Sequence, residues 1–153
     1  MTRALVGIGG LLLLCFTILG LTVYLTRTED RIAVDNLLAE DLSRAVGTAQ
    51  ADNGGRVELA RVADFGWREV LVVEAGTPRA TISEALGYEW EGDVNFGVVP
   101  VLIFLGADGK VERFADYRGE GVFEGFATPI DRLERSASTL RVSDLVITQA
   151  TMG

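Results

Sequence analysis

A long uncharged segment near the N-terminus constrains this chain more than any other feature of its sequence. The 23 residues from Ala4 to Thr26 contain no charged side chain, and 16 of them are hydrophobic. At a rise of about 1.5 Å per residue, a helix of this length exceeds the ~30 Å hydrocarbon core of a bilayer. We therefore expect residues 4–26 to cross the lipid bilayer as one helix, within a tail and transmembrane anchor of residues 1–27.

Two other interpretations of this segment are weaker. A cleaved signal peptide has a shorter apolar region followed by small residues in an Ala-x-Ala-like pattern, and residues 20–26 offer no convincing site of this kind. Lipidation of Cys15 would require Gly or Ala before it, where this chain has Leu14. We favour a retained single-pass signal anchor and keep a cleaved signal peptide as an alternative.

The orientation of the anchor is inferred from its short N-terminal tail. Arg3 precedes the span, whereas Arg27, Arg31 and Arg44 come after it, so Lys/Arg counting alone would place the C-terminal side in the cytoplasm. A very short tail before a long apolar run is nevertheless usual for a signal anchor that exports the C-terminal part of its chain. We expect a cell-membrane protein whose soluble domain lies on the extracytoplasmic side.

Charge and composition exclude several functions for the remaining chain. Residues 28–153 hold 22 acidic and 12 basic residues, a net charge of −10, which disfavours binding to nucleic acid. The sequence has no histidine, so Ser-His and Cys-His catalysis and His-ligated zinc are excluded. The one cysteine, Cys15, lies in the apolar segment. We expect no cofactor and no metal.

A membrane-proximal helix is expected over about residues 30–51, almost without a linker after the anchor. Its apolar residues recur with a period near 3.6, and Asn53 to Gly55 tolerate the left-handed backbone that ends a helix. The helix is expected to pack on its own sheet and to run on from the anchor, with a coiled-coil homodimer as a less favoured arrangement. The stripe consists of Val34, Leu38, Leu42, Ala45, Val46 and Ala49.

Further elements are expected along the soluble part. The apolar run within residues 69–74 predicts a buried strand, and Thr77-Pro78 predicts the start of a helix of two to three turns ending at Gly87. Asp108-Gly109 predicts the turn of a hairpin between 98–105 and 110–117. A short helix over 130–135, a last strand or pair of strands within 140–147, and a frayed tail at 148–153 complete the expectation.

This order of elements predicts an α+β fold. We expect one domain, residues 28–147, in which helices pack on one face of a mostly antiparallel sheet.

The candidate ligand-binding residues are two tryptophans and a neighbouring acidic group. Trp67 and Trp90 have aromatic faces that stack on ligands, although tryptophan also packs in small cores. Three carboxylates flank Trp90, but their spacing matches no EF-hand loop, so no metal site is assigned. These carboxylates are Glu89, Glu91 and Asp93.

Two resemblances accompany these patterns. The stretch from Gly97 to Phe104, with Asp108 to Val111 after it, is similar to the proline-strand-turn-strand portion of thioredoxin-like folds, but the soluble part has no cysteine and we do not assign that fold. Phe65-Gly66-Trp67, Thr77-Pro78, the run from Leu86 to Trp90, and Leu140-Arg141-Val142 resemble a group of small anchored or secreted bacterial proteins of unassigned function. The second resemblance implies a membrane-anchored or secreted α+β domain.

Taken together, the sequence favours a single-pass membrane-anchored interaction or accessory domain without catalytic activity. Its expected partner is a protein of a membrane complex or a second copy of the chain. An exported ligand-binding module using Trp67 and Trp90 is the first alternative. A carboxylate-dependent hydrolase, which requires two convergent Asp or Glu side chains, is the second.

Overall fold

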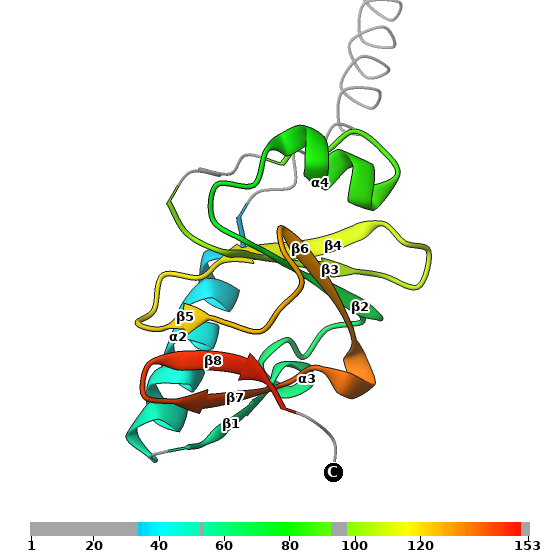
Figure 1. Ribbon diagram of the computed structural model, residues 1–153. Helices are drawn as coiled ribbons and strands as arrows, with labels where there is room; N and C mark the ends of the chain where they lie inside the picture. Colours follow the sequence, from blue (N-terminus) through cyan, green and yellow to red (C-terminus); the bar gives the residue numbers. More distant parts are fainter. Residues whose placement is uncertain (1–33, 53, 93–97, 151–153) are drawn as a thin grey trace, which may run out of the picture. The chain divides into compact units, whose positions relative to one another are not determined.

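Two four-stranded sheets and three α-helices make up the part of the chain that the computed structural model describes, residues 34–52, 54–92 and 98–150 (Figure 1). The first sheet has the order β1 (Arg56–Glu58), β7 (Thr139–Ser143), β8 (Val146–Gln149), β5 (Val122–Phe123). The second has the order β4 (Val111–Asp116), β3 (Val101–Leu105), β2 (Glu69–Val73), β6 (Ile130–Glu134). Neighbouring strands are antiparallel except β5 and β8, which are parallel. The fold is therefore α+β with two mostly antiparallel sheets, where the sequence predicted one.

The predicted transmembrane segment, residues 4–26, lies outside the described residues. Within residues 34–52, 54–92 and 98–150, no helix combines the length and the hydropathy needed to cross a membrane.

The helix α2 (Asn36–Ala51) begins six residues later than predicted, because Asp35 caps it. Asp35 has an extended backbone, and its Oδ1 accepts a hydrogen bond from the Leu38 N–H at 3.0 Å. Its own N–H donates to the Phe114 carbonyl at 2.9 Å, and its carboxylate pairs with Arg113. The sequence predicted that this helix would continue from the anchor. Val34 and Asp35 are not helical, so α2 is not continuous with the segment before them.

The β4-β3-β2-β6 sheet is buried on both faces, so the helices do not share one face as predicted. Val70 and Val72 of β2 pack in the same apolar cluster as Leu42 of α2. Leu71 and Val73 point to the other face and pack in a second cluster. That second cluster contains Ile82 of α4 (Arg79–Leu86), which covers this face, as Figure 1 shows.

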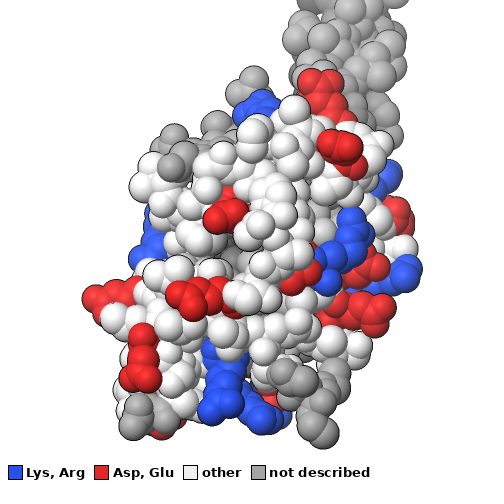
Figure 2. Space-filling view, viewed as in Figure 1, with Lys and Arg blue, Asp and Glu red and all other residues white. Residues whose placement is uncertain are grey.

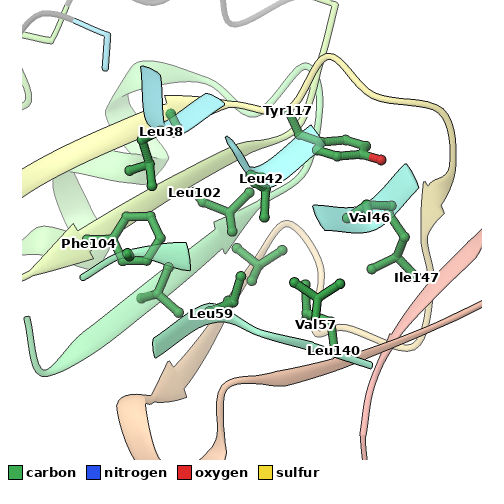
Figure 3. Packing of buried hydrophobic residues seen from close by; sticks show 14 of the residues in the cluster. Leu38, Leu42, Val46, Val57, Leu59, Leu102, Phe104, Tyr117, Leu140 and Ile147 are labelled. Atoms are coloured by element: carbon green, nitrogen blue, oxygen red, sulfur yellow. The ribbon is translucent and has the colours of Figure 1, made fainter. Parts of the chain in front are cut away.

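The first cluster joins α2 to both sheets (Figure 3). Leu38, Leu42 and Val46 of α2 point toward Leu102 and Phe104 of β3, and toward side chains of the first sheet. Val34, which the sequence placed on the same stripe, instead packs against the second cluster. The helix α2 thus packs against both sheets within one shared cluster. The contributors from the first sheet and α3 (Leu59–Val62) include Val57, Leu59, Leu140 and Ile147.

Three local predictions are confirmed by the strands, the hairpin and the helix end near β3. β2 is a buried strand, and β3 and β4 form the hairpin whose turn contains Gly109 at a φ of +78°. Gly87 ends α4 at a φ of +79°, as expected. Thr77 does not cap this helix, however, because its hydroxyl donates to the Glu74 carbonyl at 2.7 Å and the N-cap position is Pro78.

The predicted helix over 130–135 is wrong. Residues 130–134 form β6, which pairs with β2 from Val73 opposite Ile130 to Glu69 opposite Glu134. The free edge of β2 supplies hydrogen bonds along the whole segment, which a short helix in isolation would lack. A 3₁₀ turn, η1 (Arg135–Ala137), comes directly after the strand.

The last pair of strands is confirmed as β7 and β8. The chain reverses through Asp144 and Leu145, which both have positive φ angles. The tail is shorter than predicted, since Thr148 and Gln149 belong to β8 and the Ala150 N–H donates to the Thr139 carbonyl at 2.9 Å. Residues 151–153 of the predicted frayed tail lie outside the described residues.

Candidate functional site

Trp67 packs in the first cluster and is only 5% exposed. Its indole N–H donates to the Ala63 carbonyl at 2.9 Å, and its ring meets Phe104 edge to face at 5.1 Å. The guanidinium of Arg135 covers the ring at 5.0 Å from its centroid. The indole therefore packs as a core residue with its polar atom satisfied.

Trp90 lies in the second cluster, on the opposite face of the β4-β3-β2-β6 sheet, and is 1% exposed. Its ring meets Phe114 edge to face at 5.0 Å. Its backbone N–H donates to the Ser83 hydroxyl at 2.9 Å. The two tryptophans predicted to share a ligand platform are thus buried in different clusters, and neither presents an open ring face.

The acidic residues beside Trp90 do not converge in the described chain. Glu89 and Glu91 are exposed, and Asp93 lies outside the described residues. Within residues 34–52, 54–92 and 98–150, no group of three Asp, Glu, His or Cys side chains has the geometry to hold a metal ion.

A different site appears where the two sheets meet at the edge strand β5. A pocket of about 350 Å³ opens between the end of β2, Pro100 before β3, and the segment 121–128. Glu74 is the one ionisable residue among those that line it, so the pocket suits an apolar side chain better than proton transfer between paired groups. The lining residues are Val72, Val73, Glu74, Ala75, Pro100, Gly121, Val122, Phe123, Gly125, Phe126, Ala127 and Thr128.

Two glycines position the aromatic wall of this pocket. Gly121 and Gly125 have φ angles of +118° and +76° and bound the two-residue strand β5. Phe123 from this strand packs edge to face on Tyr117 at 5.2 Å and contacts Phe126 at 5.6 Å. Val122 beside it is 60% exposed, so this part of the pocket presents an apolar side chain to solvent.

Tyr117 supports the aromatic wall from behind. Its hydroxyl donates to the Glu120 carbonyl, and its ring is buried. Burial, with a smaller contribution from the nearby Glu120 carboxylate, raises the pKa of Tyr117 from 10.0 to about 12. Tyr117 is therefore neutral at physiological pH and serves as a buried support for Phe123.

Acidic residues lie in and directly beside the segments that line the pocket. Glu74 lines it, while Glu120 and Glu124 flank β5, and all three are exposed. None of the three forms an ion pair with another residue of the described ranges. Figure 2 shows uncharged surface around a hollow near the middle of this face, with acidic side chains above and below it. The pocket is therefore lined mainly by apolar residues, and we call Glu74, with Glu120 and Glu124 next to the lining residues in sequence, its acidic rim.

Sequence patterns did not single out this site. Residues 119–129 contain several glycines and few alternating apolar residues, so the sequence predicts an irregular segment there. A strand of two residues is too short to produce a periodic pattern, and the other walls come from β2 and Pro100, which are distant in sequence. The one feature of the sequence that could have indicated the pocket is the group of large apolar residues Val122, Phe123 and Phe126 among glycines.

Comparison of the chain with protein-family models, with curated proteins and with solved structures found no match.

Proposed function

We propose that this chain is a membrane-anchored interaction module that binds a partner protein through the pocket beside β5. The observation that carries the proposal is the 60% exposure of Val122 beside the half-buried Phe123 and Phe126, at a pocket that the fold builds from both sheets. Exposed apolar surface lowers solubility, and when it surrounds a concave site it commonly marks a place where another molecule binds.

The chemistry of the pocket favours binding over catalysis. A carboxylate-dependent hydrolase needs a second carboxylate converging with the first, and Glu74 has no such neighbour among the pocket-lining residues. The aromatic side chains Phe123 and Phe126 are the type of residue that is enriched at protein interfaces.

The setting we propose is the extracytoplasmic side of a cell membrane, with residues 4–26 as the anchor. The uncharged length of that segment supports a single span. An anchor restricts the module to partners near the bilayer and raises their effective concentration.

Site-directed photocrosslinking of the full-length chain in the membrane of the producing cell tests this proposal. A benzophenone side chain is placed at Val122, and a matched one at Leu37, which is 76% exposed on α2 and does not line the pocket. We expect a discrete adduct from position 122 that is absent from position 37 and is lost when Phe126→Ala is added. Equal adducts at both positions, or none at position 122, would overturn the proposed binding role.

A further inference from the structure

Building on the proposed binding role, we propose that the partner contributes an extended, basic segment that adds to the free edge of β5 as an extra strand. This inference concerns the conformation and charge of the bound molecule, which the pocket alone does not specify.

The hydrogen bonds of β5 show which of its backbone groups are free to pair. The Val122 N–H donates to the Leu145 carbonyl at 2.8 Å, and the Glu124 N–H donates to the Ile147 carbonyl at 2.9 Å. Successive residues of a strand direct their backbone groups to opposite sides, so the N–H and C=O of Phe123 point away from β8. Because β5 is the outer strand of its sheet, these two groups have no neighbouring strand within the sheet to pair with.

An open strand edge beside an apolar pocket fits an extended peptide. Main-chain groups of the peptide would pair with Phe123, and every second side chain would lie on the face of the pocket. The aromatic rings of Phe123 and Phe126 and the side chain of Val72 would receive an apolar side chain there. Free strand edges are ready templates for this kind of pairing.

Charge distinguishes the bound segment from a second copy of this chain. Two copies joined edge to edge through β5 would bring their exposed Glu120 and Glu124 side chains together, and like charges facing each other across a ladder are unfavourable. A segment carrying Lys or Arg between its apolar residues would instead bring opposite charge to Glu120 and Glu124, on the face away from the apolar side chains. The acidic rim therefore selects a basic partner over self-association.

Residue-resolved amide hydrogen exchange of the full-length chain in detergent micelles provides a direct test. The probe is a blocked peptide of about eight alternating Val and Lys residues, a length typical of one strand. With the peptide at about 1 mM, we expect exchange of the Phe123 amide to slow by about tenfold, while the Val122 and Glu124 amides change less than about twofold because β8 already protects them.

Three variations make the test specific. A peptide with Glu in place of Lys should leave the Phe123 amide unprotected, and so should a Val-Lys peptide with alternate backbone N-methyl groups that cannot form the ladder. In the protein, the double variant E120Q/E124Q should bind the Val-Lys peptide several-fold more weakly. The control variant E84Q, which neutralises an exposed carboxylate on α4, should leave binding unchanged.

Failure of the inference can be told apart from failure of the proposed function. If position 122 crosslinks to a partner but the Phe123 amide is never protected by the Val-Lys peptide, the added strand is wrong and the binding role stands. A crosslinked adduct of twice the mass of the chain would identify a second copy as the bound molecule. It would overturn the proposal that the partner is a basic segment. Absence of both crosslinks and protection would remove the inference together with the function on which it rests.

Discussion

Tyr117 shows how a polar side chain is accommodated inside an apolar cluster of this protein. The ring is 2% exposed and packs between Phe123 and the first cluster, while the hydroxyl reaches the Glu120 carbonyl. The neutral phenol satisfies its hydrogen bond in this position, but a phenolate there would lose most of its hydration. The burial of Tyr117 therefore has two effects. It supports the pocket wall, and it makes the stability of the folded chain depend on the protonation of this one side chain.

This arrangement predicts a specific loss of stability at high pH. The pKa of Tyr117 is about 12 in the folded chain and 10.0 for an unperturbed tyrosine, so the folded state holds the proton more tightly. Its contribution to stability is complete below pH 10 and is lost as the pH rises from 10 to about 12. Denaturant unfolding on either side of this window should show a larger fall in unfolding free energy for the native protein than for Tyr117→Phe. Parallel losses in the two proteins would contradict the assignment.

At the level of elements, the connection from α2 to β1 depends on close backbone packing at Gly55. A Cβ atom at this position would lie 2.6 Å from both the Cα and the carbonyl oxygen of Ala49. The Gly55 N–H also donates to that carbonyl, and the Gly55 carbonyl accepts from the Val142 N–H in β7. Gly55 therefore joins the end of the helix to the first sheet.

The same substitution at two glycines should have opposite effects on stability. Gly55→Ala should lower the free energy of unfolding by about 1–3 kcal/mol, because the clash is with backbone that cannot move without separating α2 from β1. Gly47→Ala, in the exposed middle of α2 with no atom within 4 Å of its Cβ, should raise it by about 0.5–1 kcal/mol. Thermal or urea unfolding of the two variants measures both signs. A Gly55→Ala variant as stable as the native protein would show that the close approach does not matter, and a destabilised Gly47→Ala variant would contradict the expected gain in the helix.

For the whole molecule, the anchor that we propose at residues 4–26 raises the question of which side of the membrane the acidic domain would occupy. The β3-β4 turn is suited to answering it, because Ala107 is exposed there and the hydrogen bonds that define the turn involve its neighbours. A thiol at this position should therefore be reactive without disturbing the hairpin.

The proposed topology predicts labelling of Ala107→Cys in intact cells by a membrane-impermeant maleimide, with Cys15→Ala removing the native thiol. The full-length chain should sediment with the membrane fraction, and permeabilising the cells should not increase the labelling. Ala115→Cys, at a fully buried position, should be labelled only after denaturation and so controls for folding. Labelling of position 107 that requires permeabilisation would place the domain in the cytoplasm.

Several features of this fold were predictable because they depend on residues close together in sequence. Asp108-Gly109 specified the hairpin turn, Gly87 the end of α4, and the β-branched run the strand β2. The stripe of α2 was identified, but its start was misplaced, since the cap at Asp35 is fixed by Phe114 and Arg113 from β4. Local patterns thus located the elements more reliably than their limits.

The candidate site was not predictable in the same way. Trp67 and Trp90 were singled out by residue type, yet packing placed them in separate clusters. The pocket residues are brought together by the pairing of β5 with β8 and by the approach of β2, which no short window of sequence contains.

By itself, the sequence determined the uncharged length of residues 4–26, the acidic character of the rest, the absence of imidazole chemistry, the turn of the main hairpin, and the presence of α2 and α4. Only the tertiary structure decided that residues 130–134 are a strand, that the second sheet exists, and that β5 is an outer strand beside a mainly apolar pocket. The physical reason is that turns and caps are satisfied within a few residues. The hydrogen bonds and buried contacts of a sheet edge, in contrast, belong to partners that the chain brings together only by folding.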